Sequence, residues 1–318
     1  MEIKRVALVG LGAIGSYLAP RLERALGHGN FLVVASGERR GRLEREGTVI
    51  NGETYHFTVA DPAGGVVPPA DLVIFAVKWP QLAQAVEDVR PLVGEDTALL
   101  SLLNGVESEE VLARAYGWDR VLYGLIRVSS RREGHAVAFD PGAGCIFFGE
   151  KRNAPPYTPR VAAIAALFDR AGIRCQISED MVKEVWLKFC TNIGENMTSA
   201  VIGNWYGTWR RSEHAVYTRR AAYLEVLALA EKLGVSITEE EVLGKLSTTT
   251  PFYNKPSTRQ DIEARRPTEV DMFSGAVVRM GRELGVPTPV NEWLYHAIRL
   301  IEEMNAGALE LPGGREGA

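Results

Sequence analysis

A short apolar run at the start of the chain leads directly into a glycine-rich loop, and this arrangement restricts the fold more than any other feature. The run from Ile3 to Gly10 is short and β-branched, as is typical of a buried parallel strand. The loop consists of Gly10, Leu11, Gly12, Ala13, Ile14 and Gly15, and an apolar-periodic helix follows it to about residue 25. A strand, a G-x-G-x-x-G loop and a helix in this order predict a dinucleotide-binding turn.

Each glycine of the loop has a physical reason in that interpretation. Gly10 allows the tight turn, Gly12 lets the backbone approach a pyrophosphate, and Gly15 lets the helix pack on the strand. The N-terminus of the helix favours the anion. The alternative is a glycine-rich turn of purely structural use. We therefore expect residues 10–15 to bind the cofactor.

The end of the second expected strand, 31–35, indicates which dinucleotide the loop would hold. An NAD site places Asp or Glu there to bind the ribose 2′-hydroxyl, but this chain has Ser36, followed by Glu38, Arg39 and Arg40. A serine and an arginine suit a 2′-phosphate, so the expected cofactor is NADPH. The alternatives are that Glu38 reaches the ribose or that the arginines form a solvated helix face.

Strands alternate with helices through the first half of the chain. Further strands are expected at 71–77, 97–103 and 173–177, with antiparallel edge strands at 136–141 and 145–149. Beyond residue 178 the pattern is helical, with helices expected at 178–202, 210–233, 238–246, 268–284 and 288–304. The expected fold class is α/β, with a Rossmann-type doubly wound parallel sheet in an NADP(H)-binding domain, 1–177, and an all-helical domain, 178–318.

Three sites in the second half have the composition of helix starts. Ser178, ahead of two acidic residues, is expected to cap the first helix with its hydroxyl. Thr238 with Glu241, and Thr268 with Asp271, have capping-box spacing. These caps set the expected starts of three helices.

The first of these helices carries a narrow polar stripe. Each step of four residues turns an α-helix by about 40°, so Lys188, Asn192 and Asn196 fall within about 80° of one another. Asparagine is a poor helix former, and two of them beyond a lysine suggest polar groups aimed into a cleft. A solvated stripe with the lysine extended along it explains the pattern equally well.

Composition excludes several classes of function. A net charge of −4 without a long basic run argues against a nucleic-acid partner. No window reaches 18 uninterrupted apolar residues, and the early strand leaves no room for a signal peptide, so no membrane partner is expected. Cys145, Cys175 and Cys190 lack metal-type spacing, so no metal is expected, and a reducing, cytoplasmic setting fits them.

Several motifs together resemble the ketopantoate reductases, also called 2-dehydropantoate 2-reductases, over nearly the whole chain. These are the glycine loop, Lys78 and Asn104-Gly105 after strands, the helix with the polar stripe, and the segments 256–262 and 266–271. The four-residue spacing from Lys188 through Asn192 to Asn196 and the twelve-residue spacing from Ser257 to Glu269 fit the family.

This resemblance implies that the helical domain, 178–318, is the substrate-binding and catalytic domain, and that the active site lies between the two domains. It also implies a role for each matching residue. Lys188 would be the general acid that protonates the alkoxide formed at C2, and Glu269 would hold the substrate and the lysine. The hydroxyl and oxo groups of the substrate would form hydrogen bonds with Asn192, Asn196 and Asn254, and its carboxylate would contact Ser257. Two further residues, Asn104 and Lys78, would lie between cofactor and substrate. The implied reaction is NADPH-dependent reduction of 2-dehydropantoate to pantoate, on the route to pantothenate and coenzyme A. Members of the family include dimers, so a homodimer is possible.

Some positions depart from the family pattern. Ser36 stands where an arginine usually contacts the 2′-phosphate, and Leu103 replaces the usual Gln before Asn-Gly. Thr258 and Arg259 replace an apolar pair, and Arg127, Arg131 and Arg132 lie in a segment normally rich in small residues.

Two alternatives therefore stand beside the main hypothesis. One is a reductase of another branched 2-oxo acid, and the other is a catalytically silent NADP(H)-binding sensor.

Overall fold

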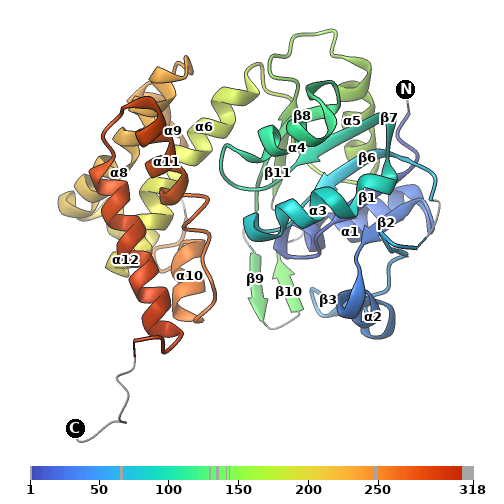
Figure 1. The fold of residues 1–318 in the computed structure, drawn as a ribbon, viewed down its shortest axis with the longest axis horizontal. Coiled ribbons are helices and arrows are strands. Elements are labelled where there is room, and N and C mark those ends of the chain that lie inside the picture. The colour runs from blue at the N-terminus through green and yellow to red at the C-terminus, as the bar shows by residue number, and fades with distance from the viewer. Residues whose placement is uncertain are drawn as a thin grey trace, which may run out of the picture. The chain divides into compact units, whose positions relative to one another are not determined.

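The computed structural model describes residues 2–64, 67–128, 130–133, 136–140, 142, 144–246 and 250–309, except for the side chains of 130–133. The chain divides into two compact units, Met1–Val185 and Trp186–Ala318 (Figure 1). The expected domain boundary at 177/178 stays a prediction. Arg131 and Arg132 belong to the residues whose side chains lie outside the description.

The first unit is built on an eight-stranded sheet with the order β12-β11-β8-β7-β6-β1-β2-β5. Its strands are β1 (Val6–Val9), β2 (Phe31–Val34), β5 (Val59–Ala60), β6 (Ala70–Phe75), β7 (Val93–Ser101), β8 (Val121–Arg127), β11 (Cys145–Gly149) and β12 (Cys175–Gln176). All neighbouring pairs are parallel except β11 with β8. The sheet confirms the predicted Rossmann-type α/β fold.

Helices flank this sheet, and its central strand is buried on both faces. They are α1 (Ala13–Leu26), α2 (Gly37–Glu46), α3 (Leu82–Asp88), α4 (Ser108–Tyr116) and α5 (Pro159–Arg170). Along β1, Val6 and Leu8 belong to one apolar core cluster, whereas Ala7 and Val9 belong to another. Successive side chains of a strand point to opposite faces, so a sheet covered on both sides needs an uninterrupted apolar strand.

A second, four-stranded sheet has the order β4-β3-β10-β9 and corrects one prediction. Its strands are β3 (Thr48–Ile50), β4 (Glu53–Tyr55), β9 (Ser130–Glu133) and β10 (Ala136–Phe139). The expectation that 136–141 lies on the edge of the main sheet is wrong, because β10 pairs with β3 and β9. The unpredicted partner is the β3–β4 hairpin, whose turn residues Asn51 and Gly52 have φ of 50° and 85°. An Asn-Gly pair is a strong hairpin signal, and Asn51 Oδ1 also accepts a 2.9 Å hydrogen bond from the amide of Phe139.

The second unit is all-helical, as predicted. Its helices are α6 (Met181–Asn192), which begins in the first unit, α7 (Thr198–Ile202), α8 (Glu213–Lys232), α9 (Glu239–Lys245), α10 (Ser257–Glu263), α11 (Ser274–Leu284) and α12 (Pro289–Asn305). A π-helical segment, η4 (Ile193–Met197), joins α6 to α7, and a 3₁₀ segment, η5 (Tyr206–Arg210), precedes α8. Within the described part of the chain, no helix has both the length and the apolar character needed to cross a membrane.

Two of the three predicted helix starts are wrong, and tertiary contacts explain one of them. Thr238 and Glu241 form the predicted capping box at α9. In contrast, α11 begins at Ser274, because the segment 269–273 forms turns and the amide of Thr268 donates to Glu302 Oε1 at 2.6 Å, a contact from α12. The amide that a capping box would use is therefore already satisfied from another helix.

The start of α6 is the second correction. The helix begins at Met181, and Asp180 Oδ1 accepts a 3.0 Å hydrogen bond from the amide of Lys183. The hydroxyl of Ser178 is buried and has no hydrogen-bond partner among the described residues. Asp180 therefore caps the helix in place of Ser178, and it also pairs with Arg152 at 2.6 Å.

We predict that Asp180→Ala lowers the free energy of unfolding by about 1 kcal/mol, because the amide of Lys183 loses its cap. Asp180→Asn should retain most of that stability, since an asparagine caps equally well. Ser178→Ala should change it by less than about 0.5 kcal/mol, because it removes a buried hydroxyl that forms no bond. Urea unfolding followed by circular dichroism measures all three. A larger loss for Ser178→Ala than for Asp180→Ala would contradict this assignment of the cap.

Candidate active site

The glycine loop has the shape that a pyrophosphate requires. Gly10 has φ of +102°, a conformation that other residues rarely adopt, and a Cβ placed on Gly15 would lie 1.9 Å from the carbonyl oxygen of Gly10. A Cβ on Gly12 would meet no atom within 4 Å. The turn is thus closed toward the protein and open at Gly12, where α1 begins. An open backbone at a helix N-terminus fits an anionic phosphate.

Three other predicted cofactor residues follow neighbouring strands of the same sheet. Ser36 comes after β2 and precedes α2, Lys78 follows β6, and Asn104 follows β7. Because β1, β2, β6 and β7 are parallel, their carboxyl ends meet at one edge together with the glycine loop. Ser36 and Lys78 are exposed there, and Asn104 is half-buried. The structure therefore brings the predicted cofactor residues to one edge of the sheet.

Arg39 and Arg40, near the start of α2, differ in exposure. Arg40 donates from Nε to Glu44 Oε1 at 2.8 Å and from Nη1 to Asp61 Oδ2 at 2.5 Å. These hydrogen bonds, first that to Glu44 and then that to Asp61, raise the pKa of Arg40 above its ordinary value. Arg39 is exposed on the same turn of α2. The guanidinium of Arg40 is thus held by two carboxylates within the protein.

The polar stripe of α6 runs into the π-helical segment η4, which the sequence pattern did not predict. Asn196 is buried, with an exposed fraction of 6%, and Lys188 and Asn192 are half-buried. The side chain of Asn196 donates to Asn192 Oδ1 at 3.1 Å and accepts from the hydroxyl of Ser257 at 3.4 Å. The buried Nδ2 of Asn192 has no hydrogen-bond partner among the described residues. The stripe is therefore a protected polar group, and a fully solvated face does not describe it.

Hydroxyl groups satisfy backbone carbonyls on both sides of the π-helical segment. Thr191 donates to the carbonyl of Lys188 at 2.8 Å, Thr198 to that of Gly194 at 2.5 Å, and Ser199 to that of Asn196 at 3.1 Å. An i→i+5 turn contains more residues than an α turn, so it changes which side chains share a face. The step from Asn192 to Asn196 therefore departs from the 40° of a regular helix.

Helix capping does not explain the positions of three further predicted site residues, which are Glu269, Ser257 and Asn254. Glu269 is half-buried in the turn before α11, so the prediction that it occupies the first turn of a helix is wrong. Ser257 is the first residue of α10, and its hydroxyl bonds Asn196 rather than capping the helix. Asn254 is exposed, and its backbone pairs with Pro251 and Tyr206. A hydrogen bond joins Ser257 to the stripe, whereas among the described residues the side chain of Asn254 forms no hydrogen bond with it.

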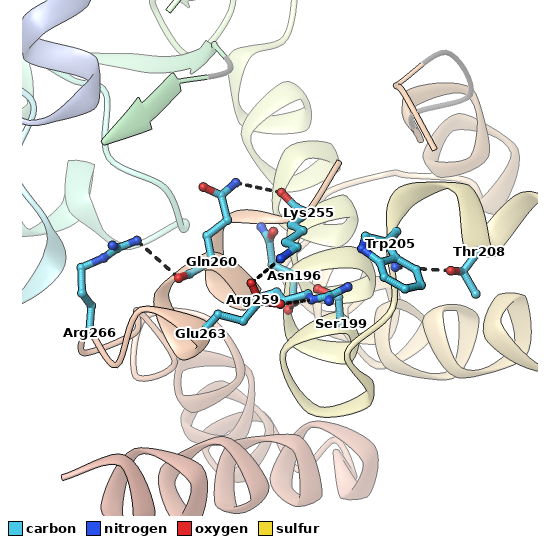
Figure 2. Close-up of polar contacts among 9 residues, drawn as sticks. All are labelled: Asn196, Ser199, Trp205, Thr208, Lys255, Arg259, Gln260, Glu263 and Arg266. Atoms are coloured by element: carbon cyan, nitrogen blue, oxygen red, sulfur yellow. Dashed lines mark hydrogen bonds and ion pairs between the residues drawn. The ribbon is translucent and has the colours of Figure 1, made fainter. Parts of the chain in front are cut away.

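Lys255, just before α10, forms a second polar group with Arg259 and Glu263 of α10, near Asn196 of the stripe (Figure 2). Glu263 accepts from Lys255 Nζ at 2.5 Å and from Arg259 Nε at 2.9 Å. The guanidinium of Arg259 lies 4.9 Å from the ring centre of Trp205, and its buried Nη1 has no partner in the described part of the protein. Arg259, a departure from the family pattern, is thus mainly buried and held by Glu263 and Trp205.

Comparisons with known proteins agree with both units. The family model described as ketopantoate reductase PanE/ApbA matches residues 6–153, and the model of its C-terminal part matches residues 180–302. A 2-dehydropantoate 2-reductase of Streptococcus pyogenes serotype M6 is 26% identical over 291 residues, which cover 89% of this chain and 93% of that protein.

Solved structures show the same fold. A PanE/ApbA family ketopantoate reductase from Ralstonia eutropha JMP134 is 28% identical, has a TM-score of 0.77, and is matched over 95% of this chain and 99% of its own. The ternary structure of D-mandelate dehydrogenase with NADH and anilino(oxo)acetate has a TM-score of 0.83 at 22% identity, over 95% of this chain and 99% of its own. Since the family models cover most of both units, this chain belongs to the ketopantoate reductase family.

Proposed function

We propose that the protein is an NADPH-dependent oxidoreductase that reduces 2-dehydropantoate to pantoate. The family supports an oxidoreductase acting on a CH–OH group. The observation that carries the finer proposal is the hydrogen-bonded group of Asn192, Asn196 and Ser257, one helical turn beyond Lys188. Together with Lys188, this group presents amide, hydroxyl and ammonium groups, which suit recognition of a small hydroxylated 2-oxo acid.

Reduction of a 2-oxo acid adds a hydride to the carbonyl carbon and a proton to the carbonyl oxygen. A bound reduced nicotinamide supplies the hydride. We assign the proton to Nζ of Lys188, whose half-buried position stabilises developing negative charge more strongly than water does. Glu269 is proposed to hold both the lysine and the substrate. Its position outside a helix removes the explanation that it merely opposes a helix dipole.

The amides and Ser257 supply the substrate contacts of this proposal. Nδ2 of Asn192 is a buried donor without a partner among the described residues, and such a group is rare unless a ligand or water satisfies it. Asn196 links Asn192 to Ser257, which is proposed to meet the substrate carboxylate. Asn254 is proposed as a further substrate contact from its exposed position.

The cofactor residues at the sheet edge favour NADPH. Gly10–Gly15 are proposed to bind the pyrophosphate, and Lys78 and Asn104 to lie toward the substrate. Ser36 is exposed at the end of β2, and we propose that Arg39 binds the 2′-phosphate, because Arg39 is exposed near Ser36 at the start of α2.

A second candidate is a reductase of another branched 2-oxo acid, and the buried Arg259 favours it. A guanidinium in place of an apolar residue changes the surroundings of Ser257. The fold does not decide between the two, since a D-mandelate dehydrogenase shares it. The third candidate is a silent NADP(H)-binding sensor, which turnover would exclude.

We expect Lys188→Ala to lower kcat with 2-dehydropantoate by about 100-fold or more, because general acid catalysis contributes 10²–10⁴-fold. Oxidation of NADPH at 340 nm measures the rate, and the exposed Lys232→Ala on α8 is the matched control. Faster turnover of ketoisovalerate or oxaloacetate by the wild type would support the second candidate. No turnover of any 2-oxo acid would refute the proposed function, and unchanged turnover in Lys188→Ala would refute the role of the lysine.

Arg39→Gln should raise the KM for NADPH about 10-fold or more and leave the KM for NADH unchanged, because it removes a charge-assisted hydrogen bond to the 2′-phosphate, about 1.5–3 kcal/mol. Arg40→Gln should have a smaller effect, since its side chain bonds Glu44 and Asp61. Steady-state kinetics with both cofactors distinguish the variants. A wild-type preference for NADH would overturn the assignment of NADPH.

We also propose a homodimer, supported by an apolar stripe on α12. Trp293, Leu300 and Met304 are spaced to share one face of the helix, and all are exposed, Trp293 by 60%. We expect light scattering after gel filtration to give the mass of two chains for the wild type and of one chain for Trp293→Glu. Tyr217→Glu on α8, at a position that is also exposed, should leave the mass unchanged. A wild-type monomer would exclude the dimer.

A further inference from the structure

A buried ion pair lies directly beside the asparagine stripe. Glu195 and Arg219 are 7% and 8% exposed, and Oε1 of Glu195 lies 3.4 Å from Nη1 of Arg219. Glu195 belongs to η4 and precedes Asn196, whereas Arg219 belongs to α8. Removal of one partner alone would leave the other charge buried without compensation. The pair therefore links η4 to α8 at a defined point.

Helix α8 packs so closely against η4 that only glycine fits between them. A Cβ placed on Gly194 would lie 2.8 Å from Cγ of Arg219 and 3.2 Å from Cδ1 of Tyr223. The guanidinium of Arg219 lies 5.4 Å from the ring centre of Trp209. Burial lowers the pKa of Arg219 from its ordinary value, while the charge of Glu195 opposes that change. Arg219 thus stays in one place, against the π-helical segment.

The segment η4 directs consecutive side chains toward different partners. Glu195 contacts Arg219 of α8, and the next residue, Asn196, bonds Ser257 of α10 and Asn192. A regular α-helix would place Asn196 at a different angle to Asn192, because its hydrogen bonds run i→i+4 rather than i→i+5. A contact that fixes the side chain of Glu195 therefore also fixes the direction in which the side chain of Asn196 points.

We propose that Glu195 and Arg219 are positioning residues, which hold the π-helical register so that Asn192 and Asn196 are correctly oriented for the substrate. This inference rests on the proposed function of the two asparagines. An apolar pair of similar size would fill the same space, but it would not fix one register, which is the best attested use of buried polar pairs. Errors of about 1 Å in such a group lower rates by about 100-fold.

The experiment compares two double variants. The double Met variant combines Glu195→Met with Arg219→Met, and the matched control combines Arg220→Met with Glu239→Gln. The control removes the neighbouring ion pair of α8, 2.6 Å long and largely exposed, which joins α8 to α9. We expect the double Met variant to keep its melting temperature and its Kd for NADPH, while kcat for the 2-oxo acid that the wild type reduces falls about 10-fold or more. Arg219→Lys in an otherwise wild-type chain should retain more of kcat than the double Met variant, and the control should match the wild type. Unchanged kcat in the double Met variant would overturn the proposal.

A coupling test covers the case in which the double Met variant is also less stable. Asn196→Ala should lower kcat/KM in the wild type and have little further effect in the double Met background, because both act through the same amide. Equal effects in the two backgrounds would refute the proposal.

Hydrogen exchange of the amides at 193–197 gives a readout that does not need turnover. Exchange should be faster in the double Met variant and unchanged in the control. If the wild type reduces no 2-oxo acid, the proposed function fails. Unchanged exchange would instead show that the pair does not hold the π-helical register.

Discussion

The hydrogen-bond register of the backbone between Lys188 and Ser199 is the constraint on which the proposed catalytic group depends. One turn of i→i+5 bonding separates two regular helices, and hydroxyls of Thr191, Thr198 and Ser199 satisfy carbonyls around it. Such segments are rare and occur frequently at functional sites. Because the register decides where Asn196 points, it links the local backbone to α8 on one side and to α10 on the other.

The first unit shows a similar dependence of a site on backbone geometry. The sheet brings the glycine loop, Ser36, Lys78 and Asn104 to one edge because the strands that precede them are parallel. No side chain of the loop is needed for this, since the open backbone at Gly12 and the close contact at Gly15 shape it. The proposed cofactor site thus depends mainly on strand order, and its proposed preference depends on side chains.

Two of the corrections to the sequence-based predictions have a common cause. Thr268 has suitable chemistry for a cap, but Glu302 of α12 takes its amide, whereas the replacement of Ser178 by Asp180 as the cap of α6 is local. The β3–β4 hairpin was signalled by an Asn-Gly pair, yet its pairing with β10 joins residues far apart in the chain. Local preference is weak where a distant residue offers the same hydrogen bond, because each such bond contributes only about 1 kcal/mol.

The sequence by itself determined the strand, loop and helix at residues 3–25, the alternation of the first unit, the helical second unit and the capping box of Thr238, since these depend on residues close together in the chain. It also indicated which polar residues share the helix that begins near 180. Only the tertiary structure decided that Asn196 is buried and bonded to Ser257, and that Arg40 is held by Asp61. The local sequence leaves several backbone registers and hydrogen-bond partners nearly equal in free energy, and packing between distant segments determines which of them form.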